Sequence, residues 1–295
     1  MLAIVIPYYK ISFFEETLLS LAGQTNKNFA VYIGDDAGPD SPQPLLKKYE
    51  TAFTCIYHRF EQNLGSVSLT KQWERCIALT GNEEWIMILG DDDVLNKNVV
   101  DEFYKHAPQF SGASNVVRFA SQSIASSGEK RSAVFMQPAQ ESAADAFYRR
   151  FKKQTSSTLS EYVFRKEIFL KHGFRNYPLA WHSDDMAWLD FAEDKPVYAI
   201  NDAVVYVRYS DINISGKKNN LAEKAKASEI FYKECMDEKF SLFTRKRLAE
   251  ILYRYETGIR GHRQMNRNDW AYLFKKYFYC RQVIPFLKLI RRRII

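Results

Sequence analysis

The chain of 295 residues lacks the long apolar runs and paired cysteines that mark membrane-spanning and secreted proteins. No apolar run approaches the roughly 20 residues that a membrane-spanning helix needs. Its four cysteines, Cys55, Cys76, Cys235 and Cys280, have no CxxC spacing, which favours a reduced, cytoplasmic protein. The first ten residues, MLAIVIPYYK, contain no basic leader and no small-residue cleavage site. We therefore expect a first strand there rather than a signal peptide.

Glycine-rich phosphate-binding motifs are also missing. The sequence contains neither GxxxxGKS or GxxxxGKT nor GxGxxG, so phosphate binding by a glycine loop is not supported. It contains no internal repeat and no low-complexity tract. Because 46% of the residues are hydrophobic and 15% are aromatic, the chain can bury a large core, either as one domain with an appendage or as two domains.

What the sequence does have is an uneven distribution of charge. Residues 217–295 contain 20 of the 42 Lys and Arg but 8 of the 35 Asp and Glu, a surplus of 12 positive charges. The other residues, 1–216, contain 22 Lys and Arg against 27 Asp and Glu, a surplus of 5 negative charges. This asymmetry points to an anionic partner, such as a membrane surface, a phosphate-bearing substrate or nucleic acid. A solvated helical face is the alternative.

Short apolar runs alternate with helical patterns in the first part of the chain, which predicts βαβ units and a mostly parallel sheet. We predict strands at residues 2–7, 29–33, 54–58, 85–89, 116–120, 134–136, 161–164, 197–200 and 204–208. We predict helices at residues 14–22, 45–49, 66–79, 142–151 and 184–192, and then at 220–239, 242–258 and 270–293. The predicted domains are therefore residues 1–216 and a helical, basic region of residues 217–295.

Acidic residues follow two of the predicted strands, Asp35-Asp36 in one case and Asp91–Asp93 in WIMILGDDDVL in the other. In a parallel sheet, ligands bind beyond the carboxyl ends of the strands, where these two segments would meet. Clustered carboxylates suit a hard divalent cation, Mg²⁺ or Mn²⁺ rather than zinc, held together with substrate phosphates. They predict a phosphorylated ligand such as a nucleoside diphosphate. The alternative is a surface turn in which Asp93 or Asn96 caps the next helix.

Five segments in this order resemble family 2 glycosyltransferases of the GT-A fold: IVIPYY, VYIGDDAGPDSP, NLGSVSLTKQWERCIALT, WIMILGDDDVL and HSDDMAWLDFA. The resemblance covers roughly residues 1–215. It implies an α/β fold with a Rossmann-like, mostly parallel central sheet flanked by helices, here with a helical C-terminal extension. It also implies inverting transfer of a sugar from a nucleotide-diphosphate donor, expected to be a UDP-sugar, with Mn²⁺ or Mg²⁺. The implied acceptor is a hydroxyl of a glycan or lipid-linked saccharide in bacterial surface polysaccharide synthesis.

The resemblance assigns a donor site to the first three segments. Asp36 matches the acid that hydrogen-bonds the donor base. Lys71 lies in a helix where a basic residue often faces the donor, although solvation of that helix is the alternative. The other implied donor residues are Pro7 and Tyr8 at the end of the first strand, and Asn63 and Gly65 in an NxG turn.

The resemblance places Asp91–Asp93 in the family's DxD region, in one of two registers. Either the three aspartates are themselves DxD, or Gly90 replaces the first acid of a DxDD pattern. Asp93 is an acid of the motif in both registers, so it is the preferred metal ligand. Asp92 is the next metal ligand and also a donor-binding residue, and Asp91 contacts the ribose or occupies the x position.

One segment departs from the family pattern. VRYSDINIS resembles the segment that closes the donor site, and aligning Asn213 and Ser215 puts Ser210 where a histidine often sits. Because that histidine can bind the metal or a phosphate, its absence puts a third protein ligand in doubt. Arg208 and Lys217 are then candidates for neutralising phosphate charge.

Asp184-Asp185 resembles the family's ED pair at the start of a helix, whose second acid is the catalytic base, so Asp185 is the predicted base. A sugar hydroxyl is a weak nucleophile, and a carboxylate within hydrogen-bond reach can take its proton as the new bond forms. The alternative is a helix N-terminus at which carboxylates are favoured by the helix dipole. His182 is a candidate acceptor contact or a structural residue.

The last 26 residues, WAYLFKKYFYCRQVIPFLKLIRRRII, combine aromatic, aliphatic and basic residues and contain no acid. This composition suits the interface of an anionic membrane, here the inner face. Pro285 is expected to kink or divide the helix. The alternatives are a helix packed on the catalytic domain and nucleic-acid binding, and since no nucleic-acid motif accompanies the charge we expect no nucleic-acid partner.

Two other functions remain alternatives on a related fold. A sugar-phosphate nucleotidyltransferase also uses acidic loops and Mg²⁺, but it needs a glycine-rich, basic loop after the first strand. The segment PYYKISFFEE is not such a loop. The second alternative is a non-catalytic protein that binds a membrane surface or nucleic acid, against which Asp36, Asp93 and Asp185 argue.

Overall fold

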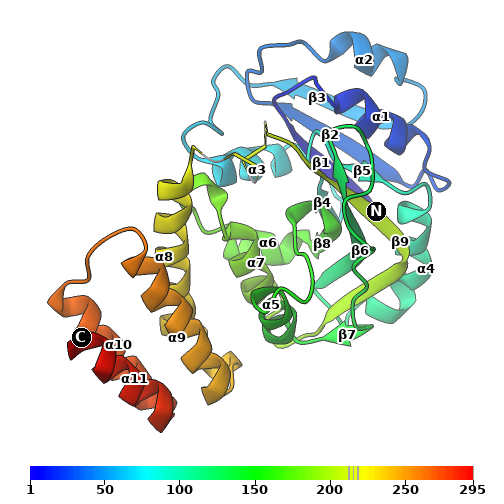
Figure 1. The fold of residues 1–295 in the computed structure, drawn as a ribbon. Coiled ribbons are helices and arrows are strands. Elements are labelled where there is room, and N and C mark those ends of the chain that lie inside the picture. Colours follow the sequence, from blue (N-terminus) through cyan, green and yellow to red (C-terminus); the bar gives the residue numbers. More distant parts are fainter. Residues whose placement is uncertain (212, 215, 218, 295) are drawn as a thin grey trace. The chain divides into compact units, whose positions relative to one another are not determined.

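The computed structural model describes residues 1–211, 213, 214, 216, 217 and 219–294, and it confirms the predicted α/β fold class. The chain forms two compact units (Figure 1). The first comprises Met1–Asn176 and Ser183–Lys217, and the second comprises Tyr177–His182 and Lys218–Ile295. A short segment from the middle of the chain, Tyr177–His182, therefore belongs with the C-terminal helices, which the sequence pattern did not indicate.

The described part of the first unit is built on a nine-stranded sheet. Its strands are β1 (Leu2–Tyr8), β2 (Phe29–Asp35), β3 (Thr54–Arg59), β4 (Trp85–Ile88), β5 (Val94–Leu95), β6 (Val116–Ala125), β7 (Gln140–Glu141), β8 (Tyr162–Arg165) and β9 (Val197–Tyr209). The order is β3-β2-β1-β4-β8-β6-β9-β5, and β7 pairs with β9. β1 to β4, β6 and β9 run in one direction, because β8 is antiparallel to both β4 and β6. The sheet is thus mostly parallel, as predicted.

The central strands are buried on both faces. In β1, alternate residues Leu2, Ile4 and Ile6 belong to the core cluster that includes side chains of α1 (Phe14–Ala22) and α4 (Val99–Phe110). The intervening Ala3 and Val5 point to the opposite face and are equally inaccessible to solvent. Burial on both faces is the reason why such strands read as continuous apolar runs in the sequence.

The other helices of the first unit are α2 (Gln43–Lys48), α3 (Leu69–Ile77), α5 (Ala143–Phe151), α6 (Lys166–His172) and α7 (Ser183–Phe191). Ser68 and Ser142 cap α3 and α5, since their hydroxyls accept hydrogen bonds from backbone N–H groups in the first turn. The expectation that Asp93 or Asn96 caps the helix after β4 is wrong, because the N-cap residue of α4 is Asn98.

Two strand predictions differ from the structure. Residues 134–136 form no strand, and only an isolated bridge joins Phe135 to Ser121. The two strands predicted at 197–200 and 204–208 are one strand, β9. Its pairing with β6 shifts between Ile200 and Val204, so residues 201–203 form a bulge that the pattern reads as a turn.

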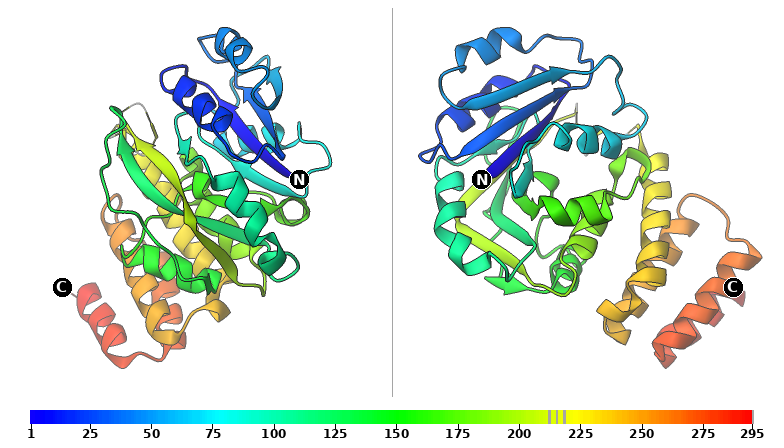
Figure 2. Two further views of the ribbon diagram at one scale, coloured as in Figure 1. Left: turned by 90° about the vertical axis from the view of Figure 1, so that its right-hand side faces the viewer. Right: turned by 180° about the vertical axis from the view of Figure 1, so that it is seen from behind.

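The second unit contains α8 (Leu221–Glu238), α9 (Arg245–Arg260), α10 (Arg267–Cys280) and α11 (Val283–Ile294), yellow to red in Figure 2. The helix predicted at 270–293 is thus two helices. The break comes at Arg281, which has a left-handed conformation (φ 50°), and Pro285 lies in the first turn of α11, where proline is tolerated. Among the described residues, no helix is both long and apolar enough to cross a membrane.

Candidate active site

The loop after β4 is tied to the end of β1 by Asp91. Its Oδ2 accepts hydrogen bonds from the backbone N–H groups of Tyr9 and Lys10, both at 2.9 Å. Burial and the neighbouring charge of Asp92 raise the pKa of Asp91 to about 6, and the two N–H donors oppose this shift. Asp91 therefore brings the carboxyl ends of two parallel strands together.

Asp93 is the most deeply buried of the three aspartates, and both of its carboxylate oxygens have protein partners. Oδ1 accepts a hydrogen bond from the backbone N–H of Arg208 at 2.8 Å, and Oδ2 accepts one from the Ser160 hydroxyl at 2.5 Å. Burial and the charge of Asp92 raise the pKa of Asp93 to about 8. This carboxylate joins β4, the end of β9 and the segment before β8.

Asp92 lies between these two residues and is partly exposed. Burial raises its pKa, while a hydrogen bond from the side chain of Asn213 and the charges of Lys10 and Arg208 oppose the shift. Its carboxylate is more exposed than that of Asp93 and therefore more accessible to another ligand. The preference for Asp93 as metal ligand stays a prediction, but the difference in exposure favours Asp92.

Gly90 leaves room for this arrangement of carboxylates. A Cβ at this position would lie 2.9 Å from Oδ2 of Asp93 and 3.1 Å from Oδ1 of Asp92. Both distances are shorter than ordinary contacts of a Cβ atom. An acidic residue at position 90, as in a DxDD pattern, therefore requires a different placement of Asp92 and Asp93.

The acid predicted to contact the donor base, Asp36, organises the predicted NxG turn. Its carboxylate accepts hydrogen bonds from the backbone N–H groups of Leu64 (2.7 Å) and Gly65 (2.9 Å) and pairs with Arg75. A Cβ on Gly65 would lie 2.5 Å from Oδ2 of Asp36, so only glycine fits there. Asn63 closes the turn by accepting a hydrogen bond from the N–H of Ser66. Two segments that are far apart in the sequence thus meet.

The other predicted donor residues differ in exposure. Tyr8, the last residue of β1, is buried, and its hydroxyl donates a hydrogen bond to the carbonyl of Asp40 at 2.9 Å. Pro7 is partly exposed in β1, and Lys71 is exposed in the first turn of α3. The roles of these three residues in donor binding stay predictions.

The end of β9 is fixed by Arg208, whose guanidinium is fully inside the protein. It donates to the carbonyls of Asp92, Ala125 and Ser126 and pairs with Glu16. The Arg208 guanidinium, a candidate for neutralising phosphate charge, is therefore already used in contacts within the protein. Two residues later, the Ser210 hydroxyl is buried and has no hydrogen-bond partner among the described residues. Ser215 lies outside the described residues.

The predicted base, Asp185, lies in the first turn of α7 and is buried. Its Oδ2 is 2.9 Å from Nη1 of Arg150. Burial and the charge of Asp185 raise the pKa of the more exposed Asp184 to about 7, and Arg150 opposes the shift. A carboxylate pair in which one member has a pKa near neutral pH is suited to general-base chemistry.

A tyrosine links this pair to the loop after β4. Burial raises the pKa of Tyr209, the charge of Arg150 lowers it, and the charges of Glu161 and Asp93 raise it. Arg150, the partner of Asp185, and Asp93 therefore both act on the same ring. Asp36 and Asp91 bond to the end of β1, and Arg150, the partner of Asp185, lies near the same tyrosine as Asp93.

A sequence model described as "Glycosyl transferase family 2" matches residues 3–169, more than half of the chain. The chain belongs to glycosyl transferase family 2. This membership confirms the resemblance read from the sequence and favours glycosyl transfer over nucleotidyl transfer. Among curated proteins, none matches this glycosyltransferase.

Three solved structures of TarS from S. aureus share the fold of this glycosyltransferase. The complex with UDP-GlcNAc has 13% identity over 93% of this chain and 79% of that chain, with a TM-score of 0.67. The complex with UDP has 15% identity over 96% and 82%, with a TM-score of 0.65. TarS 1–349 without a stated ligand has 15% identity over 95% and 80%, with a TM-score of 0.64. At such identities the likeness shows the fold alone.

The glycosyltransferase has strained backbone directly before α7. Leu179 (φ 58°), Ala180 (φ 52°) and His182 (φ 73°) are all left-handed without being glycine. His182 stacks on Phe231 of α8 with ring centroids 4.5 Å apart, and its Nε2 is 3.0 Å from the Ser228 hydroxyl. Of the two expectations for His182, these contacts favour the structural one.

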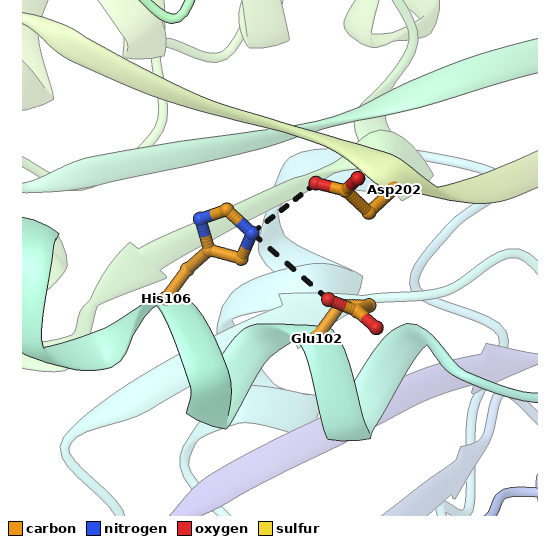
Figure 3. Close-up of side chains that lie close together, drawn as sticks. All are labelled: Glu102, His106 and Asp202. Atoms are coloured by element: carbon orange, nitrogen blue, oxygen red, sulfur yellow. Dashed lines mark ion pairs between the residues drawn. The ribbon is translucent and has the colours of Figure 1, made fainter.

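A second group of possible metal ligands lies away from the DDD loop. Glu102 and His106 of α4 approach Asp202 of β9, with Nε2 of His106 3.3 Å from the carboxylate of Asp202 and 4.0 Å from that of Glu102 (Figure 3). Nδ1 of His106 is 2.8 Å from the hydroxyl of Tyr198. Asp202 precedes Arg208 by six residues on the same strand, roughly 20 Å at about 3.3 Å per residue. These ion pairs are therefore separate from the candidate active site.

The sequence pattern missed three residues that hold the acids in place, namely Arg75, Arg150 and Ser160. They lie within two helices and a short 3-10 turn, and Arg150 and Ser160 belong to no motif. Each reaches its aspartate from at least 35 positions away along the chain. Arg75 and Asn213, the partners of Asp36 and Asp92, lie in segments that carry the family resemblance, but the resemblance assigned neither of them a role.

Proposed function

We propose that this chain transfers a sugar, with inversion, from a nucleotide-diphosphate donor to an acceptor hydroxyl. The proposal rests on one observation: hydrogen bonds of Asp36, Asp91 and Asp93 join the ends of β1, β2, β4 and β9. A backbone bond from Asp36 to Tyr8 (3.0 Å) completes this set. In parallel sheets this edge is where ligands bind.

The proposed donor is a UDP-sugar. Its support is family membership, together with a shared fold with TarS structures that contain UDP-GlcNAc or UDP. In this chain two segments would hold the nucleoside. They are the turn at Asn63–Gly65, which Asp36 fixes, and the end of β1 at Pro7 and Tyr8. Asp91 and Asp92 would face the ribose and the diphosphate.

The proposed cofactor is Mn²⁺ or Mg²⁺, held by Asp92 and, in the register read from the sequence, by Asp93. The donor set fits such a cation. Every candidate ligand atom of these side chains is an oxygen, burial raises the pKa values of the three aspartates, and the buried Ser210 hydroxyl has no partner among the described residues. When bound, the cation supplies neutralising charge to the leaving diphosphate.

The proposed base is Asp185, acting within the pair Asp184–Asp185. The acceptor oxygen forms a bond to the anomeric carbon while the bond from that carbon to the diphosphate oxygen breaks. The acceptor proton passes to a carboxylate of the pair, and the electron pair of the broken bond leaves with the diphosphate. Arg150, 2.9 Å from Asp185, holds the carboxylate in one orientation.

The proposed acceptor is a hydroxyl of a glycan or lipid-linked saccharide of bacterial surface polysaccharide synthesis, reached from the cytoplasmic face of the membrane. The family resemblance supports the acceptor class. The basic surplus of residues 217–295 supports a location next to an anionic surface.

A panel of UDP-sugars tested with Mn²⁺ is the direct test. We expect at least one UDP-sugar to raise the thermal unfolding midpoint and to be hydrolysed slowly without acceptor. Asp92→Asn should lose the Mn²⁺ response, whereas Asp202→Asn, in the separate ion-pair group, should keep it. If no nucleotide sugar stabilises the protein with or without Mn²⁺, the donor proposal is wrong.

A further inference from the structure

The turn between α10 and α11 exposes a group of large apolar side chains. Five of them are 54–70% exposed within ten residues: Phe278, Tyr279, Val283, Ile284 and Leu287. We call these five residues the α10–α11 tip. Soluble proteins rarely leave such a contiguous group uncovered unless it binds something.

Four cations surround the tip, namely Lys275, Arg281, Lys288 and Arg291. All four are exposed, and among the described residues none of them has an ion-pair partner. Residues 270–295 contain no Asp or Glu that would offer one. The segment that carries the tip therefore contributes only positive charge to this surface.

The remaining basic side chains of this segment are used inside the second unit. Lys276 lies 2.6 Å from Asp237, and Arg292 lies 2.6 Å from Glu256. Arg293 stacks over Trp270 at 5.4 Å. The chain thus divides its cations into a structural set and an exposed set, which the sequence pattern did not distinguish.

Helical geometry gathers the members of the exposed set and of the tip that belong to α11 on one face of that helix. At about 100° per residue, residues 283, 284, 287, 288 and 291 fall within an arc of about 140°. Leu289, on the other side of the helix, is fully buried, and Phe286 packs on Phe274 of α10 with ring centroids 6.1 Å apart. The exposed face is therefore fixed by the packing of the opposite face.

We propose that the α10–α11 tip docks on the surface of an anionic lipid bilayer. The apolar side chains enter the boundary between headgroups and acyl chains, and the four cations lie at the level of the lipid phosphates. The charge pattern selects this occupant over a second copy of the chain, because a two-fold contact would bring like charges together with no acid to neutralise them. The proposal is independent of the donor site.

Flotation of the full chain with vesicles tests the proposal. We expect binding to vesicles of phosphatidylcholine with phosphatidylglycerol at low salt, and much weaker binding to phosphatidylcholine alone. Ile284→Gln with Leu287→Gln should weaken binding more than tenfold. Gln at Lys275, Lys288 and Arg291 together should weaken it by about a hundredfold, since each cation contributes about fivefold.

Matched variants control for apolar loss and for net charge. Leu170→Gln with Leu221→Gln replaces leucines that are 70% and 65% exposed elsewhere, and should bind as the wild type does. Gln at Lys226, Arg254 and Arg267 removes three exposed cations outside the tip and should weaken binding far less. All variants should keep the wild-type unfolding midpoint within about 2 °C.

Two results would overturn the proposal. One is a wild-type chain that does not float with anionic vesicles, or tip variants that float as well as it does. The other is a wild-type dimer in light scattering that the Ile284→Gln, Leu287→Gln variant converts to a monomer without any vesicle binding. That second result would assign the tip to a second copy of the chain.

Discussion

At the end of β4 the neighbouring aspartates Asp92 and Asp93 face different parts of the chain. Asp93 satisfies the N–H of Arg208 and the hydroxyl of Ser160 inside the protein. Asp92 is partly exposed and has the side chain of Asn213 beside it. A buried carboxylate with two hydrogen-bond donors holds structure together, whereas a partly exposed one keeps lone pairs for a ligand. At the scale of single residues, Asp92 and Asp93 have the same chemistry, and their different positions in the fold give them different roles.

This difference predicts opposite effects of two alanine substitutions. Asp93→Ala leaves the buried N–H of Arg208 without an acceptor and should lower the free energy of unfolding by about 1–3 kcal/mol in the absence of metal. Asp92→Ala should change that free energy by about 0.5 kcal/mol or less and abolish the Mn²⁺-dependent rise in the unfolding midpoint. Urea denaturation and thermal shift measure the two effects.

The two substitutions control for each other because the residues are adjacent and chemically identical. Equal losses of stability would contradict the division of roles drawn from the hydrogen bonds. So would an Asp92→Ala protein that responds to Mn²⁺ as the wild type does, which would return the preference to Asp93.

At the scale of elements, the strands that carry the acids could be predicted because their signals are local. β1, β2 and β4 are short apolar runs, and their ends are marked by Pro7, Asp35 and Gly90. The antiparallel insertion of β8 between β4 and β6 could not be predicted, because nothing within its four residues specifies a neighbour. The partners of Asp93 and Asp185 were missed for the same reason, since Ser160 and Arg150 reach them only through the fold.

α7 carries a pair of acids whose protonation should control the rate. Burial and the charge of Asp185 raise the pKa of Asp184 to about 7, against the influence of Arg150. A base works only when deprotonated, so kcat/KM should fall as the pH drops below about 7. Because the charge of Arg150 holds the pKa of Asp184 down, Arg150→Gln should raise that pKa and move the acidic limb of the kcat/KM profile to higher pH.

The neighbouring arginine provides the control for this pH experiment. Arg149 pairs with Glu141 rather than with the acids of α7, so Arg149→Gln should leave the position of the limb unchanged. An identical shift in both variants would assign the effect to net charge. An unchanged profile for Arg150→Gln would remove the pair from the role of base.

At the scale of the whole molecule, the chain passes from the second unit into the candidate active site at one peptide bond. His182 is held in the second unit by stacking on Phe231 and by the hydroxyl of Ser228. The next residue, Ser183, begins α7 in the first unit, and the candidate base Asp185 follows two residues later. The left-handed conformations of Leu179, Ala180 and His182 cost of order 1–3 kcal/mol each and persist only where packing enforces them.

We therefore expect a substitution in the second unit to change catalysis through the entry to α7. Phe231→Leu removes the ring on which His182 stacks and should lower kcat about tenfold or more, because small displacements of a base are costly. The KM for the donor should stay within about twofold, since Phe231 is no part of the proposed donor site. Phe274→Leu, whose ring packs on Trp270 and Phe286, removes the same atoms in the same unit and should leave kcat unchanged. Steady-state kinetics on protein verified as folded by circular dichroism distinguishes the two, and an equal effect on kcat in both variants would reduce the role of Phe231 to general stability.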